Sequence, residues 1–416
     1  MKIGFVATRL AGVDGVSLES RKMVRVLESM GHECFYLAGE LDPDGPPGRA
    51  EPEFSFNELL VKAMHDQAFF YTTKPSGALF DLIFDDADLI RQKIEAFVSD
   101  FAIDVLISQN ASTIPMNLSL GLAIQEYVVR SRLPTICHHH DFYWERDRFL
   151  NAAIQDILDI AFPPRSEPIR HVVISTIMQR RLMSWLGVPS FYLPNVMDYD
   201  HPPPPPDEYA LSFRAEMGLT ADDVLIVQPT RIIRRKNIEK TIEIVRKLNN
   251  PRAVLFITGY EGDERGGYGA WLREEADRAG IRYRFIGDHV GPVRSLVEGR
   301  KIFSLYDVYH NADLITYPST YEGFGNAILE TIYFRKPFVV HTYPAYAVDI
   351  RSVGVQGVEF NHEVTPGMFD DIRQLLTDPA YREEIVSHNY KVAQQHFSLA
   401  RMQSVLSRVL TTFKEF

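Results

Sequence analysis

The sequence predicts an α/β protein with two doubly wound domains, each built from parallel strands joined by helices. Short apolar runs alternate with amphipathic helical segments along the chain, a pattern typical of buried parallel strands with helices on both faces. The chain has 416 residues, whereas one hydrophobic core rarely exceeds about 250–300 residues. Five consecutive prolines, Pro202–Pro206, separate one series of strands and helices from the next. We therefore expect two domains that face each other across a ligand-binding cleft.

Residues 1–200 are expected to form the first, Rossmann-like domain. Its first strand is Lys2–Ala7, and a glycine-containing loop connects this strand to a helix over Ser17–Met30. Further strands are expected at Glu33–Ala38, Asp104–Ser108, Thr135–His138, His171–Ser175 and Phe191–Leu193. Further helices are expected at Ile90–Phe101, Met116–Val129 and Met178–Leu186. Residues 40–85 fit this alternation poorly and are expected to be an insertion of loops and helices.

Residues 201–396 are expected to form the second Rossmann-like domain. The prolines after His201 cannot continue a helix or a central strand, so they indicate an interdomain hinge, with a rigid surface loop as the alternative. Strands are expected at Leu225–Gln228, Val254–Thr258, Tyr283–Ile286, Asp313–Tyr317 and Phe338–His341, and helices near 237–249, 269–279, 304–311 and 325–334. Residues 397–416 contain one more amphipathic helix, which is expected to pack back on the first domain.

The composition excludes several classes of protein and partner. Hydrophobic residues make up 45% and charged residues 24% of the chain, as in an ordinary globular protein. Lys and Arg number 18 against 27 Asp and Glu up to residue 200, and 26 against 28 thereafter, so the net charge of −11 divides into −9 and −2. An acidic first half argues against a nucleic-acid partner and against adhesion to anionic lipid.

Cysteine content and hydropathy bear on the compartment. Cys34 and Cys137 are the only cysteines, which leaves no disulfide framework and no thiolate zinc cluster. No run reaches the roughly 18 apolar residues that a membrane helix needs, and the N-terminal segment does not resemble a signal peptide. We expect a cytoplasmic protein without integral membrane contact.

The segment Tyr317–Glu330 (YPSTYEGFGNAILE) is the most informative part of the sequence. An apolar strand ends at Tyr317, and a glycine-containing turn leads into a helix whose free N–H groups favour anions. Glu322 lies in the turn and Glu330 in the helix, so the two carboxylates could contact different parts of one elongated ligand. The alternative is an ordinary strand–turn–helix with two solvated glutamates.

A second segment concentrates positive charge after a strand. Between Gln228 and Asn237 the cations Arg231, Arg234, Arg235 and Lys236 fall within six residues. Arginine and lysine there would neutralise a diphosphate and stabilise charge that develops on a departing phosphate. A solvated basic turn is the alternative.

With these motifs the chain resembles the retaining glycosyltransferases of the GT-B fold, in family 4 (glycosyl transferases group 1). The resemblance rests on the E-x7-E pair Glu322/Glu330 and on Arg231 followed five residues later by Lys236. The segments Leu193–Asp198 and Tyr306–Leu314 also resemble family segments. The sequence departs from the family at Asn237, where glycine is common, and at Val196–Met197, which replaces a glycine-containing pair.

The resemblance implies a role for several residues. Arg231 and Lys236 would hold the donor diphosphate, Glu330 the ribose hydroxyls, and Glu322 the hydroxyls of the transferred sugar. The sugar and phosphate would be oriented by backbone N–H groups of Gly323, Phe324, Gly325 and Asn326. The nucleotide base would lie near the apolar residues Phe285 and Ile286.

Two loops of the first domain are further candidates. Gly12 and Gly15 would let the backbone approach a diphosphate or sugar, although the loop lacks the full G-x-G-x-x-G of a nicotinamide site. After the strand near residue 137, three histidines are consecutive, and strand alternation places His138 and His140 on one face. The resemblance implies that His140 contacts the donor sugar, with His139 as the second choice. A metal site would use His138, His140 and Asp141.

The residues after the histidines are candidates for acceptor recognition, because aromatic faces and carboxylates suit a sugar or polyol. They are Asp141, Trp144, Glu145, Arg146 and Arg148. The alternative is a buried aromatic cluster. The acidic balance of this domain favours a small soluble acceptor that is not strongly anionic, unless Arg146 and Arg148 provide a local exception.

The expected reaction is transfer of a hexose, glucose or mannose, from a UDP-, GDP- or ADP-sugar to an acceptor hydroxyl with retention. No residue has an obvious claim to be a covalent nucleophile, so front-face attack is favoured. The basic residues would supply the counter-charge, so no metal or other cofactor is expected, and the Asp-x-Asp pairs Asp42/Asp44, Asp86/Asp88 and Asp198/Asp200 are interpreted as chance. The alternatives are an epimerase or phosphorylase on the same fold, or a non-catalytic nucleotide-sugar-binding protein.

Overall fold

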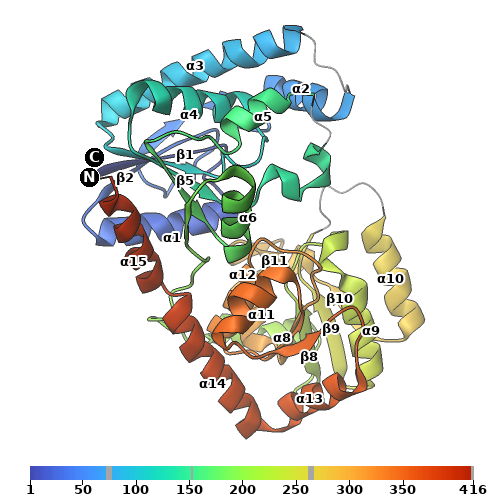
Figure 1. Cartoon of the computed structure of the whole chain (residues 1–416). Coiled ribbons are helices and arrows are strands. Elements are labelled where there is room, and N and C mark those ends of the chain that lie inside the picture. The colour runs from blue at the N-terminus through green and yellow to red at the C-terminus, as the bar shows by residue number, and fades with distance from the viewer. Residues whose placement is uncertain (72–76, 151–152, 261–266, 414–416) are drawn as a thin grey trace. The chain divides into compact units, whose positions relative to one another are not determined.

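The computed structural model describes residues 1–71, 77–150, 153–260 and 267–413, and it divides into two compact units (Figure 1). The first unit is Met1–Asn195 together with Leu399–Phe416, and the second is Val196–Ser398. Each unit is a parallel sheet with helices on its faces, so the predicted α/β class with two doubly wound domains is confirmed.

A seven-stranded parallel sheet forms the centre of the first unit, in the order β3-β2-β1-β4-β5-β6-β7. Its strands are β1 Lys2–Ala7, β2 Glu33–Ala38, β3 Gly48–Ala50, β4 Val105–Gln109, β5 Thr135–His139, β6 Ile169–Val173 and β7 Ser190–Tyr192. The chain builds outward from β1 to β3 on one side and then returns to add β4 on the other. The boundary between β1 and β4 is therefore the point at which strand order reverses, where doubly wound sheets bind ligands.

Helices cover both faces of this sheet, with α3 and α4 on one face and α1 and α15 on the other (Figure 1). The helices are α1 Gly15–Ser29, α2 Leu59–Asp66, α3 Gly77–Phe101, α4 Leu118–Ser131, α5 Gln155–Ala161, α6 Thr176–Leu186 and α15 Leu399–Thr411. In α3 the buried apolar residues recur at helical spacing, as at Ile83, Ile90, Ile94 and Phe97, and they form the stripe that packs on α4. The C-terminal helix α15 packs against α1 and β7.

A six-stranded parallel sheet forms the centre of the second unit, in the order β10-β9-β8-β14-β15-β16. Its strands are β8 Val224–Gln228, β9 Ala253–Ile257, β10 Arg282–Phe285, β14 Leu314–Tyr317, β15 Phe338–His341 and β16 Val358–Phe360. A small separate sheet contains β11 Val290–Gly291, β12 Ser295–Val297 and β13 Arg300–Ser304. The helices are α7 Glu208–Leu211, α8 Phe213–Glu216, α9 Ile238–Leu248, α10 Tyr268–Ala279, α11 Leu305–Asn311, α12 Asn326–Tyr333, α13 Pro366–Thr377 and α14 Pro379–His396.

The observed strand limits differ from some of the predicted ones for local reasons. The strand expected at His171–Ser175 ends at Val173, because Ser175 caps α6 and its hydroxyl accepts a hydrogen bond from the Met178 N–H. The helix expected from Ser17 begins at Gly15, because the Asp14 carboxylate accepts hydrogen bonds from the Val16 and Ser17 N–H groups. The expected insertion, residues 40–85, contains β3, α2 and the start of α3, and its residues 72–76 lie outside the described part of the chain.

The proline run belongs to the second unit, and the division between the units lies just before it. The chain passes from one unit to the other at Asn195/Val196 and again at Ser398/Leu399, whereas the expected boundaries were 200/201 and 396/397. Residues 196–200 are held by the second unit, because the Met197 N–H donates to the Phe397 carbonyl and the Tyr199 hydroxyl to the Leu329 carbonyl.

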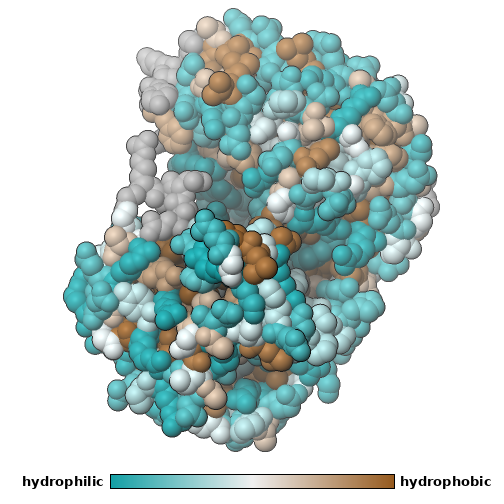
Figure 2. Space-filling view, turned by 180° about the vertical axis from the view of Figure 1, so that it is seen from behind, coloured by the Kyte–Doolittle hydropathy of each residue, from teal (hydrophilic) through white to brown (hydrophobic). Residues whose placement is uncertain are grey.

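One face of the molecule is mostly polar. Figure 2 shows one face on which hydrophilic side chains predominate and apolar ones gather only in small groups. Among the described residues, the helices are either too short or too polar to span a bilayer.

Ile107 tests how much the central strand contributes to stability. It is 0% exposed and pairs with Phe5 of β1 and Ile136 of β5. Ile107→Ala should lower the free energy of unfolding by about 2–5 kcal/mol, because the surrounding sheet cannot close the cavity. Leu59→Ala, at a position 80% exposed, is the control. Urea unfolding followed by circular dichroism should separate the two variants, and equal midpoints would contradict this account of the core.

Candidate active site

The basic turn and the glutamate-containing loop of the second unit meet where two neighbouring strands end. β8 and β14 are adjacent and parallel, so the segments that follow them lie at the same edge of the sheet. The Thr320 N–H donates to the Arg235 carbonyl over 2.9 Å, and the Asn237 amide donates to the Pro318 carbonyl over 3.2 Å. The Gln228 amide at the end of β8 donates to the Lys236 carbonyl over 3.1 Å. These bonds fix the basic turn against the loop that carries Glu322.

Glu322 lies between two cations. Its Oε2 is 2.8 Å from Nη1 of Arg235, and its Oε1 accepts a hydrogen bond from Nζ of Lys236. The side chains of Glu322 and Lys236 are only 11% and 10% exposed, so water screens this pair weakly. Burial by itself would raise the pKa of Glu322, but Lys236 and Arg235 outweigh it and hold that pKa below its usual value. The carboxylate is therefore ionised and held in one orientation.

Lys236 is the member of this group whose charge is least favoured by its surroundings. Burial lowers its pKa, Glu322 opposes that change, and the neighbouring Arg235 and Arg231 add to it. The ammonium also lies 5.3 Å from the centre of the Tyr317 ring, which favours the cation. A buried ammonium flanked by two guanidinium groups is well suited to accept a second anion.

Arg231, like Arg234, is an exposed cation of the turn. No carboxylate among the described residues forms an ion pair with it. The backbone at Gly259 packs closely against the backbone of Thr230 and Arg231. A Cβ added at Gly259 would lie 2.1 Å from the Thr230 carbonyl oxygen and 2.6 Å from the Arg231 Cα. Glycine after β9 thus lets this segment approach, and the Arg231 guanidinium is left available for a ligand.

The turn into α12 depends on a glycine. Gly325 has φ +152°, and a Cβ there would lie 2.4 Å from the hydroxyl of the buried Tyr343. That hydroxyl donates to the Phe324 carbonyl over 2.7 Å, which fixes the turn just before the first residue of α12, Asn326. The backbone of the predicted segment, Gly323 to Asn326, is thereby held rigidly at the helix N-terminus.

Glu330 lies within α12, apart from the ion pairs of Glu322. The hydroxyl of Tyr309, on α11, donates to its Oε2 over 3.0 Å, and the side chain is half-buried. Phe285 and Ile286, predicted near a nucleotide base, lie at the end of β10, the edge strand of the same sheet. Ile286 is buried, and the half-buried Phe285 ring has the Arg273 guanidinium 4.4 Å from its centre.

The backbone conformation of Asn237 explains why asparagine can stand where glycine is common in the family. Its φ and ψ are 52° and 46°, the left-handed conformation that asparagine tolerates better than most residues. The sequence departs from the family there, yet the backbone adopts a conformation that glycine would also allow.

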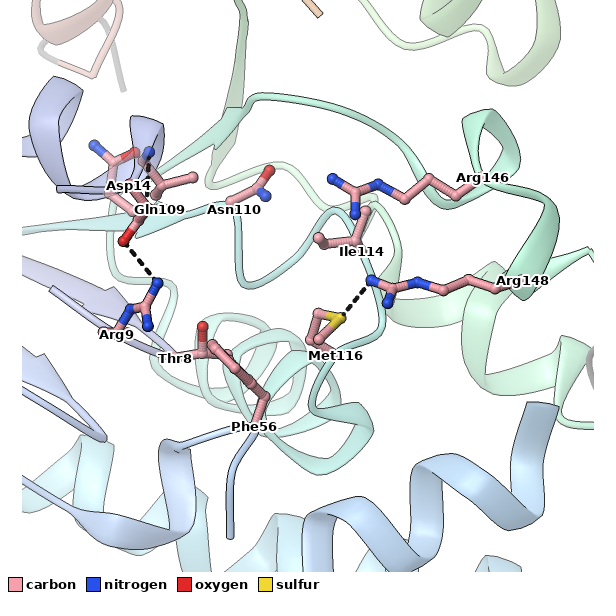
Figure 3. A pocket seen from close by; sticks show the side chains of 11 residues that line it. Thr8, Arg9, Asp14, Phe56, Gln109, Asn110, Ile114, Met116, Arg146 and Arg148 are labelled. Carbon is pink, nitrogen blue, oxygen red and sulfur yellow. Dashed lines mark hydrogen bonds and ion pairs between the residues drawn. The ribbon is translucent and has the colours of Figure 1, made fainter. Parts of the chain in front are cut away.

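In the first unit, a pocket opens where β1, β4 and β5 end (Figure 3). Arg9 and Asp14 line it from the β1 side and Arg146 and Arg148 from the segment after β5, with Asn110 between them. Asn110 has φ +58°, and its side chain accepts from the His140 N–H and donates to Asp141. Backbone strain of this kind is common at ligand sites.

The three consecutive histidines have separate environments, and all are neutral. His138 and His140 have rings 4.5 Å apart, as strand alternation predicts. His139 lies 2.6 Å from the Thr113 hydroxyl and 2.9 Å from His171. Burial lowers the pKa of each, to about 4 for His140. Nε2 of His140 is buried and has no hydrogen-bond partner among the described residues. No group of three metal-binding side chains is found in the described ranges, and His138, His140 and Asp141 form none.

The predicted acceptor residues separate into two sets. Arg146 and Arg148 line the pocket, and Asp141 lies behind it as the partner of Arg146. Trp144 instead stacks on Phe142, with ring centres 4.4 Å apart, and contacts Trp185.

Glu145 stabilises the same turn. It accepts from the Phe142 N–H over 2.9 Å and pairs with Arg181 at 2.6 Å. The predicted glycine loop lies at the start of α1. Gly15 is the first residue of α1, and Gly12, at φ +78°, donates its N–H to Asp42.

Sequence analysis missed several residues of both sites. Arg235 was recognised only as one of four cations, because its pairing with Glu322 depends on the meeting of two loops. Arg9 and Asn110 were not singled out. A usable signal existed, because Arg9 lies two residues after β1 and Asn110 directly after β4, and both strands end at the same edge of the sheet.

Comparison with known proteins places the chain in a family. Residues 212–392 match the model for glycosyl transferases group 1. The chain is 31% identical to the mannosylglucosylglycerate synthase of Thermotoga maritima over 448 aligned positions, which cover 98% of this chain and 99% of that protein. This chain belongs to the glycosyl transferases group 1 family. A mannosylglucosylglycerate synthase of Petrotoga mobilis is 29% identical over 420 positions, which cover 91% and 94% of the two chains.

Solved structures of glycosyltransferases have a fold similar to that of this chain. HepE of Anabaena, in complex with UDP and glucose, has a TM-score of 0.68 at 16% identity, covering 99% of this chain and all of that one. Sucrose-phosphate synthase of Thermosynechococcus elongatus has a TM-score of 0.64 at 15% identity, covering 100% and 99%. The predicted GT-B fold is confirmed, and this member of the family is a hexosyltransferase of carbohydrate biosynthesis.

The ion pairs of Glu322 predict a pH-dependent stability. Glu322→Gln leaves the buried Lys236 beside the half-exposed Arg235 without a counter-charge, which should lower the free energy of unfolding by about 3 kcal/mol. Because the folded pKa of Glu322 lies below its unfolded value, the wild-type advantage is complete at neutral pH. It should shrink as the pH falls below about 4.3, where the carboxylate of the unfolded chain becomes protonated, and it should vanish once the pH is below the folded pKa.

Thermal unfolding measured between pH 3.5 and 8 provides the test. Glu384→Gln, at an exposed position of the same unit for which no ion pair is found in the described ranges, is the matched control and should change little at any pH. A loss in Glu322→Gln that does not depend on pH would contradict the ion-pair explanation.

Proposed function

We propose that this hexosyltransferase moves a hexose, with retention, from a nucleotide diphosphate sugar to a hydroxyl of a small soluble acceptor. The observation that carries the proposal is the cluster at the ends of β8 and β14, where Glu322 is held between Lys236 and Arg235 with Arg231 exposed beside them. It combines surplus positive charge for a diphosphate with an ionised, oriented acceptor for sugar hydroxyls.

Each residue has a defined part in the proposed reaction. Arg231 and Lys236 bind the diphosphate and stabilise the charge that develops as the sugar departs. Glu322 accepts hydrogen bonds from hydroxyls of the transferred hexose, and Arg235 is the positioning residue that fixes its carboxylate. A phosphate oxygen of the leaving group takes the proton of the acceptor hydroxyl during front-face attack. Positioning and charge stabilisation then supply most of the rate enhancement.

The rest of the donor binds to the second unit by the same proposal. Glu330, oriented by Tyr309, receives the ribose hydroxyls. The N–H groups of the fixed turn at Gly325 bind sugar and phosphate, and Phe285 and Ile286 adjoin the base. We keep His140 as a neutral hydrogen-bonding group for the transferred sugar, because its low pKa leaves it uncharged and its Nε2 has no partner among the described residues.

The relatives suggest the substrates. The named synthases of Thermotoga and Petrotoga make a product that contains mannose, glucose and glycerate. We propose mannose as the transferred hexose and a glucosylglycerate-type molecule as the acceptor. The structure of HepE with UDP-glucose supports a nucleotide-sugar donor, so UDP-, GDP- and ADP-sugars are the donors to screen.

Arg231 provides the cleanest test of the donor site, because it is exposed and its replacement breaks no ion pair among those of the described residues. Arg231→Met should lower kcat about 100- to 1000-fold, the usual cost of removing one charge-stabilising donor. Lys236→Met should have a similar effect on kcat and also lower thermal stability. Arg246→Met, on the exposed side of α9, is the matched control. Wild-type kcat in Arg231→Met would reject the assigned role.

The product distinguishes the alternatives. Release of nucleotide should require the acceptor, and NMR of the new linkage should show the anomeric configuration of the donor. Acceptor-independent change of the donor would indicate an epimerase, and dependence on inorganic phosphate would indicate a phosphorylase.

Chelation tests the role of the cations. If Arg231, Lys236 and Arg235 supply all the counter-charge, EDTA should change the initial rate by less than about twofold, because no bound metal is then needed to stabilise the leaving group. A loss of activity that Mg²⁺ or Mn²⁺ restores would show that this charge assignment is incomplete.

A further inference from the structure

The pocket of the first unit has the position and lining of a ligand site. It lies at the ends of β1, β4 and β5, beside the boundary between β1 and β4 where strand order reverses. Its volume is about 160 Å³, and its walls combine polar groups with apolar side chains such as Phe56 and Ile114. Figure 3 shows Arg146 and Arg148 entering from one side and Arg9 with Asp14 from the other.

The charges around this pocket do not balance. Arg9 donates to the Asp14 carboxylate over 2.9 Å, and Arg146 donates through Nε to the Asp141 carboxylate over 2.5 Å. Arg148 donates to the Met116 sulfur over 2.9 Å, and its guanidinium lies 4.5 Å from the centre of the Phe149 ring. Within the described ranges, no carboxylate forms an ion pair with Arg148. Three guanidinium groups thus face two carboxylates, and one positive charge remains.

The surroundings of Arg148 favour an incoming anion. Partial burial lowers the pKa of its guanidinium, and repulsion from Arg146 adds to this, whereas Asp141 opposes it. A thioether is a weak acceptor compared with an oxygen anion. A ligand carboxylate would therefore replace a weak hydrogen bond with two strong charge-assisted ones.

The neighbouring polar groups are fixed in place. Asn110 is held by His140 and Asp141, and Asp14 both caps α1 and pairs with Arg9. Each acid is paired with an arginine, so each pair is close to neutral and repels a carboxylate at Arg148 only weakly. The apolar wall at Phe56, Ile114 and Met116 suits the carbon face of a small sugar acid.

From this geometry we infer that the pocket receives the carboxylate of the acceptor, and that Arg148 is the residue that selects acceptors with a single negative charge. The inference rests on the acceptor class proposed above, and it adds the residue and the charge that define specificity. The surplus of one positive charge matches a glycerate-type carboxylate better than a phosphate group, which carries nearly two negative charges at pH 7.

Equilibrium binding tests the inference without requiring turnover. Calorimetric titration of the full chain would use glucosylglycerate, its uncharged amide and its 3-phosphorylated form. Arg148→Gln should weaken binding of glucosylglycerate by roughly 10- to 100-fold, as expected for loss of a charge-assisted hydrogen-bonded pair. Binding of the amide should change less than about threefold, and Arg148→Lys should restore part of the lost affinity. Arg130→Gln, an exposed arginine of the same unit, is the control.

Kinetics then separates this inference from the proposed function. Arg148→Gln should raise the KM for glucosylglycerate and leave the KM for the donor unchanged. Equal losses for glucosylglycerate and its amide, an unchanged affinity for both, or no binding of glucosylglycerate by the wild-type chain would overturn the inference. Tighter binding of the phosphorylated form would overturn its single-charge part. Carboxylate binding through Arg148 without hexosyl transfer from any donor would instead reject the proposed function alone.

Discussion

The ion pairs of Glu322 are the interaction on which the proposed donor site depends. They join a turn after β8 to a loop after β14, two segments about 86 residues apart in sequence that the parallel sheet brings to one edge. Taking Glu322 and Lys236 out of water is costly, and that cost is offset only while both are present in good geometry, with the half-exposed Arg235 adding a second cation. The backbone bonds from Thr320, Asn237 and Gln228 supply that geometry. The site is therefore organised before any ligand arrives, as electrostatic catalysis requires.

The first unit follows the same design at the ends of β1, β4 and β5. Asp14 holds Arg9, and Asp141, itself bound by Asn110, holds Arg146. Arg148 is left without an acid partner among the described residues. The acidic balance of this half of the chain, −9 up to residue 200, does not describe the pocket. Net charge sets the long-range field, whereas recognition depends on the few groups within hydrogen-bond distance.

The sequence predicted elements whose signal is local. The strands Lys2–Ala7, Glu33–Ala38 and Phe338–His341 were predicted to the residue, because buried parallel strands appear as continuous apolar runs. β16 was missed because three residues, Val358–Phe360, are too short for such a signal. The E-x7-E motif and the basic run were recognised, but the pairing of Arg235 with Glu322 was not, because it depends on contacts between distant loops. Arg148 could likewise be named from the sequence. Its surplus charge could not, because that depends on Asp14 and Asp141 pairing with the other two arginines of the pocket.

The two sites can be compared by the charge that each leaves uncompensated. Beside Glu322, the cations Arg231, Arg235 and Lys236 exceed the one carboxylate by two charges, while Arg234 turns toward the Tyr268 ring. A nucleotide diphosphate sugar carries two negative charges on its diphosphate. The pocket of the first unit has a surplus of one, and a sugar acid carries one. In each of the two proposed sites, the surplus of cations over acids equals the negative charge of the proposed ligand. This arrangement limits repulsion in the unliganded protein and would still provide a full counter-charge on binding, so the charge of the proposed ligand follows from the surplus of cations over acids.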